Sequence, residues 1–216
     1  QYTLVTPISA ARFMLPYWNP YKADGSMASL NDGSWLGQGQ NPLEWLANNP
    51  VSYKKYKVFS TVFADLTLYR NLVFSSRFGA DFSHTAGFGQ SFPSYLPNQG
   101  EGSASRNSSD GLNLQLSNTL TYRFDIDNIH DFNFLLGHEW QDYHAEGFGL
   151  STAGQTNDLL TDVNSATRVT SWNSTSTSDY SRTSFFGRAE YNLADRYYIE
   201  ASARTDGSSK FGRNNR

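Results

Sequence analysis

Apolar and polar residues alternate along six separate stretches of the chain. In the first of them, Val58, Val62 and Leu66 stand at even positions, whereas Thr61 and Asp65 lie between them. Period-two alternation is typical of β-strands that expose one polar face and cover one apolar face. The stretches that show it are 56–69, 71–83, 112–126, 131–143, 182–193 and 196–205. The chain is therefore predicted to be all-β.

Short breaks join these strands in pairs and predict three antiparallel β-hairpins. The breaks lie at 70–71, 127–131 and 194–195. Two long stretches rich in Ser, Gly, Asn and Thr, 84–111 and 144–181, separate the hairpins. Short turns at one end and long loops at the other are typical of transmembrane β-barrels, whose turns face the periplasm and whose long loops face outside.

The length of the strands distinguishes a membrane barrel from a soluble sandwich. Sandwich strands commonly have about 5 to 6 residues, whereas these alternating runs have about 12 to 15. At roughly 3.3 Å per residue and a tilt near 40°, 12 residues rise about 30 Å, enough to cross an apolar band of about 25 Å. Charged residues keep to the polar parity, as they would in a sandwich too: Asp65, Arg77, Asp81, Arg123, Asp125, Glu139, Arg188, Glu190, Glu200 and Arg204.

Six strands are too few to close a transmembrane barrel, because the smallest need about eight. An open sheet in lipid would leave unpaired backbone groups at both edges, at a cost of several kcal/mol for each group. The six strands are therefore predicted to be a fragment of a larger barrel. Strands and loops together make up the predicted barrel portion, 56–216.

Residues 1–55 are predicted to be a loop-rich extracellular segment. Five prolines and turn signals such as Asp24-Gly25 interrupt it, and a short helix over 41–47 is expected, with Asn41 as its cap and Pro42 at its first position. Aromatic side chains in the outward-facing segments are candidates for contact with substrate or a partner, because sugar sites use aromatic platforms. Packing within the loops is the alternative for all six: Tyr17, Trp18, Tyr21, Trp35, Phe92 and Tyr95.

Composition excludes several functional classes. The 17 basic and 20 acidic side chains give no field that would attract nucleic acid, and the lack of cysteine excludes thiol catalysis and Cys-type zinc sites. His138, Glu139 and His144 do not have the H-E-x-x-H spacing of a zinc helix. The stretch 125–136 lacks the Gly and the final Glu of a calcium loop. The G-x-S-x-G motif, which carries the nucleophilic serine of α/β-hydrolases, does not occur in the sequence. No catalytic residue, metal or cofactor is predicted, and the protein is not expected to be an enzyme.

The last hairpin contains two distinctive segments, Ser184–Arg188 (SFFGR) and Arg204–Arg216 (RTDGSSKFGRNNR). In these residues it resembles the SusC/RagA family of TonB-dependent outer-membrane transporters. Weaker matches upstream are Asn41-Pro42-Leu43, FGADF at 78–82, NTLTY at 118–122 and LGHE at 136–139. The resemblance implies an outer-membrane barrel of 22 strands, a SusD-like surface lipoprotein as partner, and energy from TonB. It also implies that the TonB-contacting segment, the plug domain and the C-terminal strands lie outside this chain.

Two hypotheses for function follow. The first is the barrel portion of a SusC-like active importer that takes glycans or peptides across the bacterial outer membrane, with lipid around it. The second is a secreted β-rich module that binds carbohydrate or mediates adhesion. Strands of about six residues, or a protein that stays monomeric without detergent, would favour the second hypothesis.

Overall fold

The structure is a computed structural model that describes residues 15, 17–37 and 39–212. It contains one α-helix, α2 (Pro42–Asn48), and two short 3-10 helices, η1 (Leu96–Asn98) and η2 (Val163–Ser165), among these residues. The strands are β1 (Val51–Tyr69), β2 (Leu72–Ser91), β3 (Gly102–Ile126), β4 (His130–Gln155), β5 (Arg168–Leu193) and β6 (Tyr197–Ser208). The predicted all-β class with six strands is confirmed.

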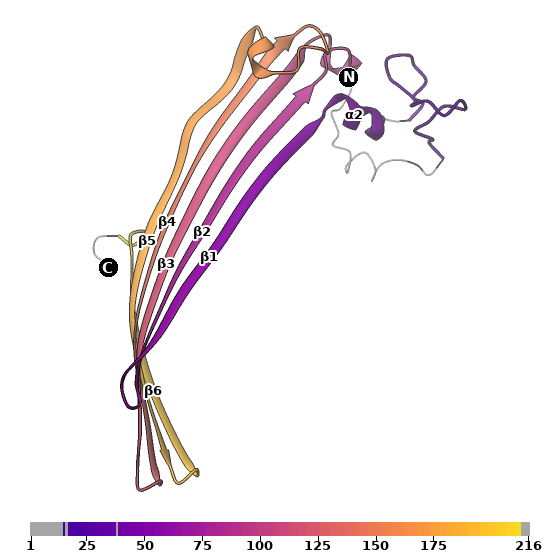
Figure 1. Cartoon of the computed structure of the whole chain (residues 1–216). Helices are drawn as coiled ribbons and strands as arrows, with labels where there is room; N and C mark the ends of the chain where they lie inside the picture. Colours follow the sequence, from indigo (N-terminus) through magenta and orange to yellow (C-terminus); the bar gives the residue numbers. More distant parts are fainter. Residues whose placement is uncertain (1–14, 16, 38, 213–216) are drawn as a thin grey trace. The chain divides into compact units, whose positions relative to one another are not determined.

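The six strands form one sheet in which each strand pairs with its neighbours along the chain (Figure 1). The antiparallel pairing of β5 with β6 runs from Leu193 opposite Tyr197 to Arg182 opposite Ser208. An order that follows the chain is what consecutive hairpins produce, because each short turn returns the chain beside the strand that it leaves.

Left-handed backbone conformations make the three tight turns. Arg70 has a φ of 37°, Asp127 and Asn128 have 56° and 54°, and Ala194 and Asp195 have 51° and 56°. Positive φ reverses the chain in a way that matches the twist of paired strands. The turns after β3 and β5 are neighbours, because the Ala194 N–H donates to the Ile129 carbonyl at 2.7 Å.

The strands are longer than the alternation predicted. The predicted loop 84–111 is β-strand up to Ser91 and again from Gly102, and the predicted loop 144–181 is strand up to Gln155 and again from Arg168. The connecting segments are only 92–101 and 156–167. The added strand residues are mostly small or polar and show no sustained alternation, but ladder hydrogen bonds between backbones do not depend on an apolar face.

The chain divides into two compact units. The first contains Gln1–Lys55, Thr85–Ser108 and Gly147–Thr175, and the second contains Tyr56–His84, Ser109–Glu146 and Ser176–Arg216. Every fully buried apolar side chain in the described part of the chain lies in the first unit: Ala28, Trp35, Tyr95, Ala104 and Ala153. The sheet of the second unit therefore has no apolar core of its own.

The short helix agrees with its prediction. α2 begins after Asn41, whose side chain accepts a hydrogen bond from the Leu43 N–H at 3.1 Å, and Pro42 occupies the first helical position. No helix in the described residues is both long enough and apolar enough to cross a membrane.

Candidate functional site

One face of the sheet in the second unit is apolar. Ring contacts link it across strands: Phe124 of β3 stacks on Phe132 of β4 with centroids 4.9 Å apart, and Phe132 contacts Tyr191 of β5 at 4.9 Å. Tyr56 of β1 stacks on His84 of β2 at 6.3 Å. Even positions of β1–β4 and odd positions of β5 and β6 thus share this face. It carries no Asp, Glu, Lys or Arg over 58–68, 72–82, 112–126, 132–140, 183–193 and 197–203.

The opposite face, called the polar face below, is crossed by hydrogen bonds between charged and amide side chains. Arg123 of β3 donates to the Asn133 side-chain oxygen of β4 at 3.2 Å, and Asn133 donates to Glu190 of β5. Arg188 pairs with Glu190 at 3.2 Å. Arg123, Asn133, Glu190 and Arg188 therefore form a continuous network over three strands.

A second network on the polar face centres on Arg204 of β6. Its guanidinium donates to Glu139 of β4 at 2.8 Å, passing over β5, and to Asp206 at 2.9 Å. Ser184 of β5, which is buried, donates its hydroxyl proton to Asp206. The same guanidinium lies 5.3 Å from the centroid of the Phe186 ring. The network places an aromatic ring and a cation together on an otherwise polar surface.

A hollow of about 220 Å³ opens on the polar face between β1 and β5. Residues of five strands line it: Thr61, Arg77, Gly79, Gln115, Leu116, Ser117, Glu139, Trp140, Gln141 and Arg182. Gln141 donates to the Asn113 side-chain oxygen at 2.9 Å. The hollow therefore has two guanidinium groups and several amide and hydroxyl groups at its rim.

Each of the four histidines contacts one carboxylate or hydroxyl group. His84 pairs with Asp110 at 2.6 Å, and His138 lies 3.3 Å from the Thr183 hydroxyl with its ring 4.8 Å from the centroid of Phe185. Within the described residues, no three His, Asp or Glu side chains are grouped so that they could hold a metal ion. Asp127 and Asn128, considered for a calcium loop, form the tight turn after β3.

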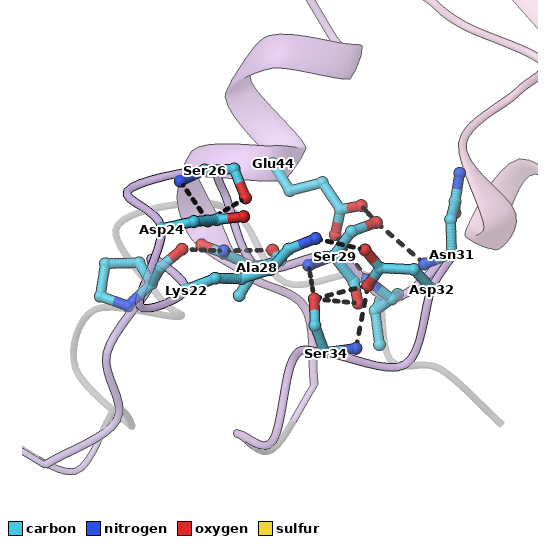
Figure 2. A network of polar contacts seen from close by, with 12 residues as sticks. Lys22, Asp24, Ser26, Ala28, Ser29, Asn31, Asp32, Ser34 and Glu44 are labelled. Carbon is cyan, nitrogen blue, oxygen red and sulfur yellow. Dashed lines mark hydrogen bonds and ion pairs between the residues drawn. The ribbon is translucent and has the colours of Figure 1, made fainter.

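In the first unit, α2 holds the preceding loop through buried polar contacts. Asn41 is fully buried, and its side-chain N–H groups donate to the carbonyls of Pro20 at 2.9 Å and Ala28 at 2.7 Å. Glu44, also buried, accepts from the Ser29 hydroxyl and from the Leu30 N–H at 3.1 Å (Figure 2). Satisfying these groups offsets the cost of burying them.

Ion pairs and local turns complete this loop. Lys22 contacts Asp32 at 2.6 Å, and Asp32 also accepts from Ser34 (Figure 2). The hydrogen bond from Lys22, followed by those from Ser34, holds the pKa of Asp32 well below its usual range, and Asp32 raises the pKa of Lys22. The hydrogen bonds from Ser26 lower the pKa of Asp24.

The structure gives different surroundings to the six aromatic candidates, all of which lie in the first unit. Tyr17 is 75% exposed and Tyr21 is 48% exposed, so both rings can meet a ligand or a partner. Trp18 is half-buried and joins Tyr17 to Trp35 by edge-to-face contacts, with centroids 6.2 and 6.4 Å apart. Trp35 is only 6% exposed, so its ring is part of the packing of this loop.

Phe92 and Tyr95 lie in the connection between β2 and β3. Phe92 is half-buried, and its N–H donates to the Asn48 carbonyl at the end of α2 at 2.9 Å. Tyr95 is fully buried, and burial raises the pKa of its hydroxyl, which finds no hydrogen-bond partner in the described part of the chain. Tyr17 and Tyr21 remain the open candidates, whereas Trp35 and Tyr95 take the packing role that was the alternative for this group.

No protein-family model matches the chain. Two curated relatives from Formosa agariphila are similar to it: TonB-dependent receptor P26, 29% identical over 215 residues, and TonB-dependent receptor P3, 28% identical over 216 residues. The alignments cover 94% and 97% of this chain but 21% of each relative. The chain thus spans about a fifth of the length of these receptors.

Solved structures of a transporter named RagAB have the same fold. The structure of the RagAB peptide transporter matches 93% of this chain and 23% of the matched chain, with a TM-score of 0.80 and 26% identity. The 'open-open' state of the RagAB peptide importer gives a TM-score of 0.79 and 27% identity over 94% of this chain. The resemblance predicted from the last hairpin is therefore confirmed.

Proposed function

We propose that this chain, a segment of a SusC/RagA-type TonB-dependent transporter, builds part of the wall of an outer-membrane β-barrel that imports glycans or peptides. The observation that carries the proposal is the two-faced sheet of the second unit. One face is apolar and free of Asp, Glu, Lys and Arg over the six ranges given above, and the other is lined by charged and amide networks.

The apolar face needs a cover that the chain itself does not supply. Val62 is 66% exposed, Leu68 is 58% exposed and Leu136 is 64% exposed, all on this face. Large contiguous apolar surfaces mark contact with a membrane or another protein. Strands β1–β5 have 19 to 26 residues and, at roughly 3.3 Å per residue, are long enough to cross a bilayer even when tilted. Lipid is the cover that fits this surface.

The sheet edges support the same proposal. β1 and β6 stand at the two edges of the sheet, so each has one side without a partner strand among the described residues. Unpaired backbone groups are not tolerated in lipid, and a barrel removes them by closing. Further strands of the same transporter would complete the barrel, and the family resemblance implies 22 in total.

The polar face would then line the interior of the barrel, and the first unit would face the outside. Tyr17 and Tyr21 are proposed to contact substrate or a SusD-like lipoprotein, because their rings are exposed on a loop that α2 holds in place. TonB would supply energy through a segment outside this chain. The strand lengths favour this function over a secreted carbohydrate-binding module, whose strands would be shorter.

The test is to purify the full-length parent protein with an affinity tag from fractionated membranes in mild detergent. We expect it in the outer-membrane fraction, together with a stoichiometric surface lipoprotein identified by mass spectrometry. Uptake of labelled oligosaccharides and of labelled peptides, with and without TonB, then separates the two substrate classes. If the protein is soluble without detergent and is isolated without a partner, the importer hypothesis is wrong and the secreted binding module is favoured.

A further inference from the structure

We propose that the hollow between Arg77 and Arg182 on the polar face binds an acidic group of the imported substrate, either a carboxylate or a sulfate. The proposal deepens the import function and rests on it, because it places this hollow inside the barrel. It concerns one subsite and leaves open whether the acidic group belongs to a sugar or to a peptide.

The first support is that neither arginine of the hollow has an ion-pair partner among the described residues. Arg123, Arg188 and Arg204 on the same face bind Asn133, Glu190 and Glu139 respectively. Neither Arg77 nor Arg182 forms an ion pair or a side-chain hydrogen bond with any described residue. Both guanidinium groups border the same hollow. Their donors are therefore free to bind a ligand.

The second support is the charge around the hollow. Glu139 is its one acidic lining residue, and its Oε2 already contacts the Arg204 guanidinium at 2.8 Å. Asp65 borders a neighbouring hollow that Arg77 also lines, but no ion pair joins the two. The field of Arg182 acts on Asp206, which is itself bound by Arg204 and Ser184. Among the described residues, Arg77 and Arg182 are thus the charged lining residues of the hollow that have no ion-pair partner.

The third support is the shape of the hollow. Gly79 lies among its lining residues, and a Cβ added there would have no neighbour closer than 3.9 Å, so the missing side chain leaves space open. A volume of about 220 Å³ is below the roughly 300 to 1,000 Å³ of whole-ligand sites. This volume suits a single sugar or amino-acid residue of a longer substrate. Gln115, Ser117 and Gln141 offer further polar groups at its rim.

Arginine forks suit a carboxylate or a sulfate because two parallel N–H donors match two oxygens of the anion. A neutral sugar or an uncharged side chain would leave the two guanidinium charges without compensation. The subsite would therefore select acidic substrates over neutral ones of the same length.

The experiment uses the full-length transporter in detergent and measures binding by calorimetry at fixed salt. The acidic probes are oligogalacturonate, a sulfated galactan oligosaccharide and an end-capped peptide that contains glutamate. The matched neutral probes are the carboxyl-reduced oligogalacturonate, the desulfated galactan and the end-capped peptide with glutamine in place of glutamate. We expect at least one acidic probe to bind more tightly than its neutral match. Arg77→Gln and Arg182→Gln are each expected to weaken that probe about ten-fold, the usual loss for a hydrogen bond to a charged group.

Two further variants separate the subsite from general damage. Arg188→Gln changes an arginine of the same face that already has a carboxylate partner, and it should leave the preference for the acidic probe intact. Gly79→Leu fills the hollow and should remove that preference while neutral probes bind as before. The sugar and peptide arms show which kind of molecule carries the acidic group.

Equal affinity of the wild type for acidic and neutral probes would overturn the proposal. It would also be overturned if Arg188→Gln weakened binding of the acidic probe as much as Arg77→Gln and Arg182→Gln do. These outcomes are distinct from failure of the import function, which would appear as a soluble parent protein without uptake. If the wild type shows no preference for acidic probes and the Arg77→Gln variant still takes up neutral substrates, the import function stands and only the acidic subsite is refuted.

Discussion

Phe186 is an aromatic residue at a polar position of its strand, and Gly137 makes room for it. A Cβ added to Gly137 would lie 2.1 to 2.6 Å from atoms of the Phe186 ring, far inside van der Waals contact. The Arg204 guanidinium lies 5.3 Å from the centroid of the same ring. One glycine on β4 thus determines where a ring of β5 and a cation of β6 can lie.

Gly137→Ala is therefore expected to destabilise the full-length transporter by about 1 to 3 kcal/mol, the usual cost of overpacking. Thermal unfolding in detergent measures it. Gly79→Ala is the control, because its added Cβ has ordinary contacts only, the nearest at 3.9 Å. Adding Phe186→Ala should remove most of the effect of Gly137→Ala, as expected for residues in contact. Equal stability of the Gly137 and Gly79 variants would contradict the clash.

The loop before α2 should be sensitive to acid but not to mild acidification. Its pair Lys22–Asp32 includes a carboxyl with a lowered pKa, ordinarily 3.8. A lowered folded-state pKa means that the stabilisation is complete above the ordinary value and is lost as pH falls through the lower folded value. Hydrogen exchange of the peptide 22–34, corrected for the intrinsic rate, should show constant protection from pH 7 to about 4 and falling protection below it.

Asp32→Asn is the matched variant, since it keeps the shape of the side chain and removes the titration. Its loop should exchange faster at neutral pH and show a smaller change on acidification. A loss of protection in the wild type centred near pH 6 would mean that another group controls the loop.

At the scale of the element, alternation was a sufficient signal only where one face is apolar. Leu112, Leu114, Leu116 and Leu120 make the middle of β3 evident from sequence. The beginning of the same strand, 102–111, contains Ser, Asn, Arg and Asp on both faces and resembles a loop. Backbone pairing with β2 and β4 continues the strand there, and backbone groups leave no trace in the residue pattern.

The candidate site was less predictable than the fold. Aromatic residues could be recognised, but burial of Trp35 and Tyr95 depends on contacts with distant residues and left only Tyr17 and Tyr21 exposed. Arg77 and Arg182 could be assigned to the polar parity from sequence. Their position at one hollow depends on the register of the intervening strands, which alternation does not specify.

The turn between β5 and β6 offers a test of backbone strain. Ala194 has a φ of 51°, where a non-glycine residue costs roughly 1 kcal/mol or more. Ala194→Gly is expected to stabilise the folded barrel by up to about 1 kcal/mol. Removing the strain of a positive φ should outweigh the larger conformational entropy that glycine gives the unfolded chain.

Ala201→Gly in the adjacent strand serves as the control, because glycine in a strand interior destabilises by roughly 0.5 to 1 kcal/mol. The midpoint of the heat-induced mobility change on semi-native gels compares the two variants. A lower midpoint for Ala194→Gly than for the wild type would show that the turn is not strained at this residue.

At the scale of the whole molecule, the two faces should tolerate charge differently. Leu120 lies on the apolar face and Thr121, the next residue of β3, lies on the polar face. In lipid, Leu120→Arg is expected to destabilise the barrel by about 2 to 4 kcal/mol near the bilayer midplane, whereas Thr121→Arg should be almost neutral. Folding of the full-length variants into liposomes across a urea series measures the difference.

The comparison also tests the membrane location itself. A soluble sheet with water on both sides would accept arginine at either position with little change. Similar urea midpoints for Leu120→Arg and Thr121→Arg would therefore count against a wall in contact with lipid.

The Arg204–Glu139 contact has a mechanical consequence for such a wall. Neighbouring strands are joined by backbone hydrogen bonds, and the sheet can bend about the axis that runs between two such strands. This contact instead ties β4 to β6 across the strand that separates them. A side-chain contact that spans two such axes, β4–β5 and β5–β6, limits bending at both. The sheet should therefore bend less at this point than where only neighbouring strands are joined.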